Sequence, residues 1–165
     1  MGMGHNLIIQ KETMKKLFKL TQDGIDELRI EMEKLISERG AITERIRSAR
    51  ELGDLSENAE YASARSEQER NENRITDIDH ILLNVELIKA PKNGKLVGLG
   101  STVSLSGGSK TKKFQIVGTV EADPMNGKIS DESPIGKALI GKKVGEKVEI
   151  VTPAETSFYT IDSIS

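Results

Sequence analysis

Residues 51–61 read Glu-Leu-Gly-Asp-Leu-Ser-Glu-Asn-Ala-Glu-Tyr and separate two long helical patterns. Gly53 suits the left-handed backbone that commonly follows the C-terminus of a helix. Asp54 is predicted to cap the next helix, and Glu57, three residues later, completes the spacing of a capping box. We therefore predict two antiparallel helices joined by a tight turn at Gly53.

The same stretch concentrates carboxylates at the predicted turn. Asp54, Glu57 and Glu60 recur at every third residue and would form a stripe that runs back from the tip, and Glu51 adds a fourth negative charge. A capping box explains Asp54 and Glu57 as structural residues, but it leaves Glu51 and Glu60 unexplained. From the residues alone, a structural role and a functional role both stay open.

Apolar residues at alternating spacings of three and four flank this turn, which is the pattern of a coiled-coil seam. The seam positions are Ile25, Leu28, Met32, Leu35, Ile42, Ile46 and Ala49 before the turn, and Tyr61, Ala64, Ile75, Ile78, Leu82 and Val85 after it. Folding the chain at Gly53 places Ile25 against Leu82 and Ile42 against Ala64. Each arm of about 28 residues would form a rod of about 40 Å.

Polar residues interrupt both seams at the same level. Arg39 in the first arm falls opposite Gln68, and Asn71 follows one turn later in the second arm. Two unrelated helices would have no reason to align such interruptions, so the coincidence favours an intramolecular hairpin. We interpret the three residues as a polar layer that fixes the register.

The composition excludes several classes of protein. The chain has no cysteine and only two histidines, so a disulfide framework or a zinc–cysteine site is excluded. No apolar run is long enough to cross a membrane, and no signal peptide is evident. Residues 21–90 carry 17 acidic against 10 basic side chains, which argues against simple binding to duplex DNA. We expect a monomeric, cytoplasmic protein.

After Ala90-Pro91-Lys92-Asn93-Gly94, which is predicted to end the second helix, the periodicity changes to short β-type runs. We predict strands at 95–99, 101–105, 113–120, 147–152 and 157–164, with turns at 107–108 and 153–155. Ser133 and Pro134 are predicted to start a short helix that Gly141 ends. The fold class is therefore α+β, with an N-terminal extension (1–18), a coiled-coil hairpin (19–90) and an antiparallel sheet domain (91–165).

The tip motif at 53–61 resembles that of the Gre family of bacterial transcript-cleavage factors, closest to its GreA-type members. Further matching segments lie at 20–24, 48–50, 127–130 and 133–142, and the resemblance covers roughly residues 19–165. Ala62 departs from the histidine that many relatives carry after the tyrosine. The resemblance implies an FKBP-like fold for the second domain.

The resemblance also implies a partner and a chemistry. Such factors bind bacterial RNA polymerase and insert the coiled coil through its secondary channel. Asp54 and Glu57 would help the polymerase hold a Mg²⁺ ion and orient a water, and the polymerase would then hydrolyse the 3′ end of backtracked nascent RNA. Because two exposed carboxylates cannot make a tight Mg²⁺ site alone, no ion is expected on the isolated chain. The protein would be a cofactor of catalysis and not an enzyme.

The resemblance suggests roles for three further sets of residues. Leu55, Asn58, Glu60 and Tyr61 would support the tip; Arg45, Arg47, Arg50 and Arg65 would contact RNA or polymerase; Asp131, Ser133, Pro134 and Ile135 would dock on the polymerase rim. Structural explanations compete with these roles. The arginines also suit a solvated helix face, Tyr61 also suits the seam, and Ser133-Pro134 also suits a capped helix start.

Three other functions compete with this one. A Gre paralogue could occupy the channel and inhibit, although retention of Asp54 and Glu57 argues against it. A peptidyl-prolyl isomerase is raised by the FKBP-like domain, but residues 91–165 contain only the aromatics Phe114, Phe158 and Tyr159. A coiled-coil adaptor without a chemical role would not need the acidic tip.

Overall fold

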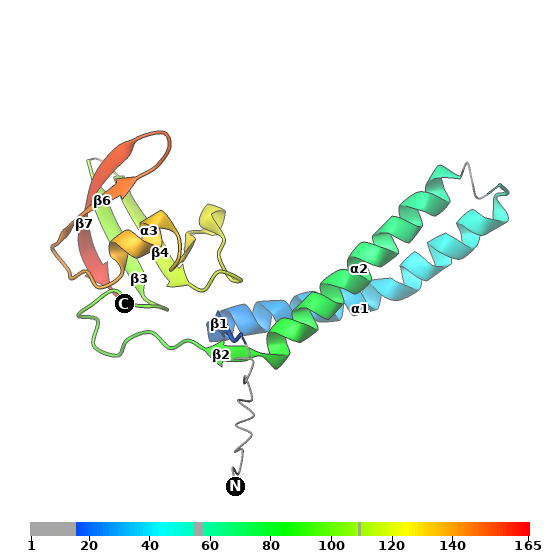
Figure 1. The fold of residues 1–165 in the computed structure, drawn as a ribbon, viewed down its shortest axis with the longest axis horizontal. Coiled ribbons are helices and arrows are strands. Elements are labelled where there is room, and N and C mark those ends of the chain that lie inside the picture. Colours follow the sequence, from blue (N-terminus) through cyan, green and yellow to red (C-terminus); the bar gives the residue numbers. More distant parts are fainter. Residues whose placement is uncertain (1–15, 55–57, 109) are drawn as a thin grey trace, which may run out of the picture.

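A computed structural model describes residues 16–54, 58–108 and 110–165, and it has two parts (Figure 1). A long helical hairpin projects from a curled β-sheet, and the C-terminal end of the first helix and the N-terminal end of the second lie farthest from the sheet. The α+β fold class is confirmed. No helix in the described part of the chain is long and apolar enough to cross a membrane.

The hairpin consists of α1 (Gln22–Glu51) and α2 (Ala59–Leu83). Thr21 caps α1, since its hydroxyl oxygen accepts a hydrogen bond from the Gly24 N–H at 3.2 Å. Gly53 has a φ of +116°, as predicted for the residue that breaks the helix. The predicted end of the second helix near Ala90 is wrong, because α2 stops at Leu83 and a short strand follows.

The predicted cap of the second helix is also wrong. Asn58 caps α2, and its Oδ1 accepts a hydrogen bond from the Tyr61 N–H at 3.0 Å. Asp54 therefore lies before the helix and does not cap it. Glu57, the other member of the predicted capping box, lies outside the described residues together with Leu55 and Ser56.

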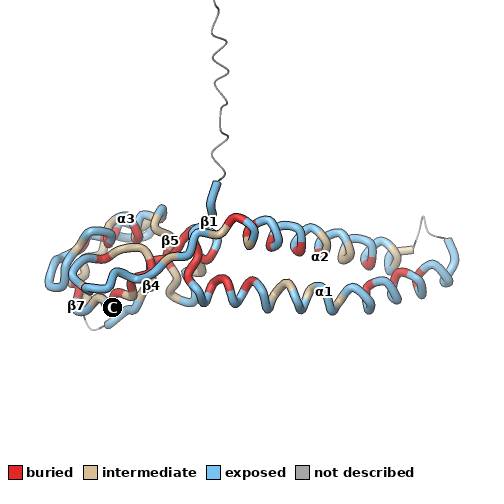
Figure 2. Tube along the Cα trace, turned by 90° about the horizontal axis from the view of Figure 1, so that it is seen from below, coloured by how far each residue is buried: buried red, intermediate tan, exposed pale blue. Residues whose placement is uncertain are grey.

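The register of the two helices agrees with the seam predicted from the sequence. Ile42, Ile46 and Ala64 form one buried cluster near the turn. A second cluster near the sheet contains the buried residues Leu20, Ile25, Leu28, Ile78 and Ile81. The residues coloured as buried lie on the facing sides of the two helices (Figure 2), so burial of this seam holds the hairpin together.

Salt bridges reinforce the register from the outer faces. Arg74 donates to both carboxylate oxygens of Glu31 at 2.6 and 2.8 Å, and this hydrogen bonding lowers the pKa of Glu31. Arg39 departs from the prediction: it leaves the seam, is exposed, and makes two 2.7 Å hydrogen bonds with Glu72. The guanidinium is therefore solvated and paired, which avoids the cost of burying it in the seam.

The C-terminal sheet has the strand order β5-β4-β3-β7-β6. Its strands are β3 (Thr102–Gly107), β4 (Lys110–Val117), β5 (Lys128–Ser130), β6 (Lys147–Val151) and β7 (Thr156–Ile164). A 3₁₀ turn, η1 (Pro124–Asn126), and helix α3 (Pro134–Leu139) complete this part. Pairing is antiparallel except between β4 and β5, which makes the sheet mixed; β5 was not predicted, and the strand predicted at 95–99 is not formed.

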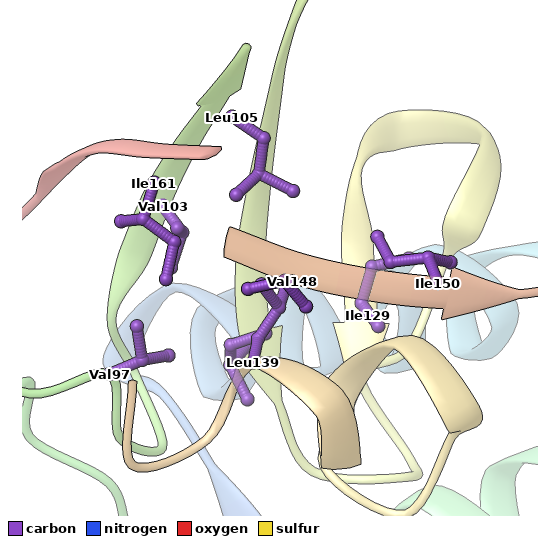
Figure 3. Close-up of a cluster of buried hydrophobic side chains, with 9 residues drawn as sticks. Val97, Val103, Leu105, Ile129, Leu139, Val148, Ile150 and Ile161 are labelled. Atoms are coloured by element: carbon purple, nitrogen blue, oxygen red, sulfur yellow. The ribbon is translucent and has the colours of Figure 1, made fainter. Parts of the chain in front are cut away.

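One apolar core fills the space between this sheet and α3. Leu139 of α3 packs with residues from all five strands and from the loop before them, and most of these side chains are labelled in Figure 3. The buried members are Val97, Val103, Leu105, Ile116, Ile129, Leu139, Val148, Ile150 and Ile161. Ser133 caps α3 as predicted, with its hydroxyl accepting from the Gly136 N–H at 3.0 Å.

A small parallel sheet and a buried carboxylate join the two parts at the base of the hairpin. Strand β1 (Phe18–Leu20) pairs with β2 (Val85–Leu87), and neither strand was predicted. Glu121, in the loop after β4, is 8% exposed and accepts hydrogen bonds from the Thr21 N–H at 2.9 Å and from its hydroxyl at 2.5 Å. The N-terminus of α1 is thereby held against the C-terminal sheet.

Lys128 adds a charged contact to this junction. Its Nζ lies 2.9 Å from Glu27 of α1 and 3.8 Å from Glu121. Burial alone would lower the pKa of Lys128, but hydrogen bonding to Glu27 and the negative charges of Glu27, Glu121 and Asp23 outweigh it and raise the pKa. The ammonium therefore stays charged, and it neutralises the carboxylates that link hairpin and sheet.

Candidate functional site at the hairpin tip

The tip is built from the last turn of α1, the connecting segment and the first turn of α2. The Leu52 N–H bonds to the Ala49 carbonyl at 3.2 Å, after which Gly53 turns the chain away from the helix. Asp54 follows and is exposed at the end of the rod. The predicted catalytic residue Glu57 and the predicted support residue Leu55 lie outside the described residues.

Asn58 connects the two helices at the tip. Its Oδ1 caps α2, and its Nδ2 donates a hydrogen bond of 2.7 Å to the carbonyl oxygen of Ala49 in α1. One side chain thus satisfies a free amide at the start of one helix and adds a second hydrogen bond to a carbonyl near the end of the other. The described segments on either side of the acidic turn are therefore fixed to each other.

Substitutions at Asn58 separate its two bonds. Asn58→Ala is expected to lower the free energy of unfolding by about 1 kcal/mol, the usual cost of removing a helix cap. Asn58→Asp retains the capping oxygen but lacks the donor to the Ala49 carbonyl. Its free energy of unfolding should therefore lie between those of Asn58→Ala and the wild type. Urea denaturation followed by circular dichroism measures both; equal stability of all three proteins would contradict the assigned role.

Tyr61 and Arg50 pack together beside the tip. Tyr61 is half-buried against the cluster of Ile42, Ile46 and Ala64, which agrees with its predicted seam position. The Arg50 guanidinium carbon lies 5.7 Å from the centre of the Tyr61 ring, in the geometry of a cation–π contact. Arg50 also occupies the last turn of α1, where a positive charge is stabilised by the helix dipole.

The predicted RNA-contacting arginines fall into two pairs. Arg45 bonds to Glu60 at 2.9 Å and also to Glu67, and Arg47 bonds to Glu44 at 2.5 Å and to Glu51 at 2.7 Å. These hydrogen bonds raise the pKa of both arginines. Arg45 and Arg47 are therefore neutralised internally, and no free basic surface forms at these two residues.

Arg50 and Arg65 differ from that first pair. Arg65 donates to the neutral amide oxygen of Gln68 at 2.6 Å. Within residues 16–54, 58–108 and 110–165, neither Arg50 nor Arg65 forms a salt bridge with a carboxylate. Of the four predicted arginines, these two therefore carry a positive charge that no carboxylate among the described residues compensates.

The ion pairs also explain two carboxylates that a capping box left unexplained. Glu51 pairs with Arg47 and Glu60 pairs with Arg45, so both carry a structural role. Sequence reasoning missed these pairs, although the spacing of Arg47 and Glu51 by four residues was an available signal. In the part of the chain described, no group of three or more acidic, histidine or cysteine side chains could hold a metal ion.

The four predicted docking residues lie around the start of α3, and two of them line different hollows. Pro134 is exposed, and Ser133 is used as the cap, with its hydroxyl also donating to the Ser130 carbonyl at 2.7 Å. Ile135 lines a groove of about 90 Å³ with Phe114 and Tyr159. Asp131 lines another hollow, of about 250 Å³, between the sheet and residues 16–19.

The groove beside Ile135 bears on the isomerase alternative. Its aromatic walls are Phe114 and Tyr159, whereas Phe158 is 65% exposed and lines no part of it. The Lys112 ammonium lies 5.3 Å from the Tyr159 ring centre and donates to its hydroxyl at 3.1 Å. A groove of this size is well below the roughly 300 Å³ at which small-molecule sites begin, which disfavours a substrate pocket.

Comparisons with known proteins cover both parts of the chain. The family model described as "Transcription elongation factor, N-terminal" (GreA/GreB) matches residues 18–87, and the model "Transcription elongation factor, GreA/GreB, C-term" matches residues 91–165.

Individual relatives agree with these matches. "Transcription elongation factor GreA" of Bacillus velezensis is 43% identical over 155 residues, covering 92% of this chain and 98% of the relative. The protein of the same name from Acholeplasma laidlawii is 47% identical over 139 residues, covering 82% and 88%. A solved structure, GreA factor homolog 1 of Thermus thermophilus, is 28% identical with a TM-score of 0.42, covering 91% of this chain and 99% of the other.

Proposed function

The chain belongs to the GreA/GreB family of transcription elongation factors, and we propose that it stimulates the transcript cleavage carried out by bacterial RNA polymerase. In this proposal the hairpin (19–90) enters the secondary channel, and the C-terminal domain (91–165) docks on the outer rim. The observation that carries the proposal is the exposed Asp54 at the far end of a two-helix rod. Such a shape suits delivery of a side chain into another molecule.

Asp54 and Glu57 would hold a Mg²⁺ ion together with groups of the polymerase. Carboxylate oxygens are donors that Mg²⁺ prefers, and Glu51 and Glu60 are bound to arginines, so they are not the ligands proposed. Mg²⁺ needs about six oxygen ligands, and proteins often supply only one or two carboxylates. When bound, the ion would polarise the phosphate and make a coordinated water more acidic.

The other tip residues would position this carboxylate pair. Asn58 fixes the start of α2 against the end of α1, and Tyr61 supports the turn from the seam. Arg50 and Arg65 would contact an RNA phosphate or the polymerase, because their charges are not compensated by a carboxylate in the described structure. In this account the chain acts as a cytoplasmic monomer and supplies no complete active site.

A cleavage assay on stalled elongation complexes tests the proposal against its competitors. A stimulating factor accelerates release of short 3′ RNA fragments, whereas an inhibitory paralogue binds the same complexes and slows RNA synthesis without fragments. An adaptor without a chemical role would tolerate neutralisation of the tip. A proline-peptide isomerisation assay would separate the isomerase alternative.

Docking is expected to depend on the start of α3. Ile135→Asp and Pro134→Ala should weaken binding to RNA polymerase by about tenfold or more, because apolar anchors in interfaces commonly contribute at least 1.4 kcal/mol. Val144→Ala is a matched control, since Val144 is a 53% exposed apolar residue of the same domain outside α3. Affinity is measured by competition with a labelled wild-type chain. Unchanged affinity of both variants would move the docking surface elsewhere.

A further inference from the structure

The apolar seam of the hairpin is divided into two parts. A base cluster around Leu28 and Ile78 is separated from a tip cluster around Ile42 and Ala64. At the level between them, Arg39 turns outward to Glu72, so α1 contributes no apolar side chain there. The facing helix α2 contributes the polar side chain of Asn71. At this level the seam therefore has a polar residue from α2 and no apolar side chain from α1.

Asn71 is buried in this interruption with only half of its carboxamide satisfied. Its side chain is 5% exposed, and Nδ2 donates to the Leu35 carbonyl of α1 at 3.1 Å. Its Oδ1 is buried and has no hydrogen-bond partner within the described residues. A buried acceptor without a partner is costly, and the described part of the chain provides no donor for this oxygen.

Two hollows adjoin Asn71 and share Ile42. The first, of about 90 Å³, is lined by Arg39, Ile42, Thr43, Gln68, Asn71 and Glu72. The second, of about 200 Å³, is lined by Leu35, Glu38, Ile42, Glu67, Arg70 and Asn71. Each exceeds the roughly 30 Å³ that one water occupies, and each has several polar walls, which are the two conditions for ordered water.

Helix α1 is intrinsically weak at the same level. Gly40 is an exposed residue in the middle of the helix, and a Cβ placed there would meet no atom within 4 Å. No tertiary contact therefore requires glycine at this position, while glycine lowers the stability of a helix interior relative to alanine. Gly40 therefore lies next to the interruption of the seam at Arg39.

We propose that Asn71, the two hollows and Gly40 form a hydrated joint in the middle of the hairpin. The packed tip segment (42–51 with 58–68) moves on the packed base segment about this level, and water from the hollows reaches Asn71 Oδ1 when the joint opens. The Asn71–Leu35 bond and the Arg39–Glu72 pair keep the register while the joint moves. This inference concerns the free chain and does not depend on the proposed function.

Hydrogen–deuterium exchange of the full-length protein tests the joint. In wild type, amides near residues 38–42 and 68–72 should exchange faster than amides of both flanking clusters. Asn71→Leu fills the interruption with an apolar side chain, and it should slow these amides by about tenfold and raise the melting temperature. Asn73→Leu, on an exposed position two residues along the same helix, should change neither.

A second variant covers the case in which Asn71→Leu disturbs the pairing of the helices. Gly40→Ala leaves the seam untouched and should slow exchange around residue 40 without changing the tip cluster. Uniform exchange along both helices in the wild type would overturn the proposal. A lower melting temperature of Asn71→Leu with native exchange at the tip and base would also overturn it, because the carboxamide would then be a necessary part of the packing.

Discussion

Replacing Asp54 by alanine is expected to abolish stimulated cleavage of backtracked RNA while leaving the affinity for RNA polymerase nearly unchanged. The side chain is exposed at the end of the hairpin, far from the C-terminal sheet that is proposed to dock. Removal of one preorganised electrostatic group from an active centre commonly costs about 100-fold or more in rate. Fragment release under single-turnover conditions measures the loss.

Two further substitutions make this test specific. Glu57→Ala should reproduce the defect, because the proposal gives both carboxylates the same Mg²⁺ ion. Asp79→Ala is the matched control, since Asp79 is an exposed aspartate of α2 at the base of the hairpin. Wild-type cleavage by Asp54→Ala, or an equal loss of cleavage and of binding, would remove the catalytic assignment.

The second large effect is expected at the junction of hairpin and sheet. Glu121→Ala removes the carboxylate that accepts hydrogen bonds from the backbone N–H and the hydroxyl of Thr21. It also removes one of the two carboxylates that pair with Lys128. Unsatisfied buried donors cost about 1–3 kcal/mol each, so a clear fall in the free energy of unfolding is expected. Gly24→Ala should act similarly, because an added Cβ would lie 2.5 Å from the Glu121 carboxyl carbon.

The junction also fixes the direction of the hairpin, which a distance measurement can follow. The chain has no cysteine, so a spin-label pair at Ser66→Cys on α2 and Lys147→Cys on β6 reports the arrangement alone. Glu121→Ala should broaden the distance distribution, whereas Glu132→Ala, at an exposed position of the same domain, should not. An unchanged distribution and an unchanged melting temperature would show that Glu121 does not couple the two parts.

The hairpin could be predicted because its signals are local and periodic. Gly53 marks the break, and the spacing of the apolar residues gives the facing sides and the register. The N-cap of α2 could not be predicted from the sequence, since Asp54 and Asn58 are both good capping residues. Asn58 is used because its amide also reaches the Ala49 carbonyl, a contact that only the paired helices create.

The parts that were missed depend on contacts between distant segments. Strands β1, β2 and β5 have three residues each, and their pairing partners lie far away in the sequence or across a loop. Three residues carry too little periodicity to be distinguished from a loop. The buried Glu121 was missed for the same reason, because its partner Thr21 is 100 positions away.

For the candidate site, the sequence indicated which charged residues lie near the tip, but it did not indicate which of them pair with one another. The pattern predicted an acidic tip and four arginines near it, but it did not distinguish Arg45 and Arg47, which pair with neighbouring glutamates, from Arg50 and Arg65. Exposed ion pairs depend on rotamers and on the facing helix, which the linear pattern does not encode. The roles of Asp54 and Glu57 stay predictions.

The Mg²⁺ dependence of RNA cleavage in arrested bacterial elongation complexes tests the central claim most directly. Fragment release is measured over a range of Mg²⁺ concentrations without factor, with the wild-type chain and with Asp54→Ala. Because the hairpin is proposed to add carboxylate ligands to a metal site of the polymerase, the wild-type chain should lower the Mg²⁺ concentration needed for half-maximal cleavage, and Asp54→Ala should not. The same Mg²⁺ midpoint in all three titrations, or no 3′ fragments with the wild-type chain, would contradict the account.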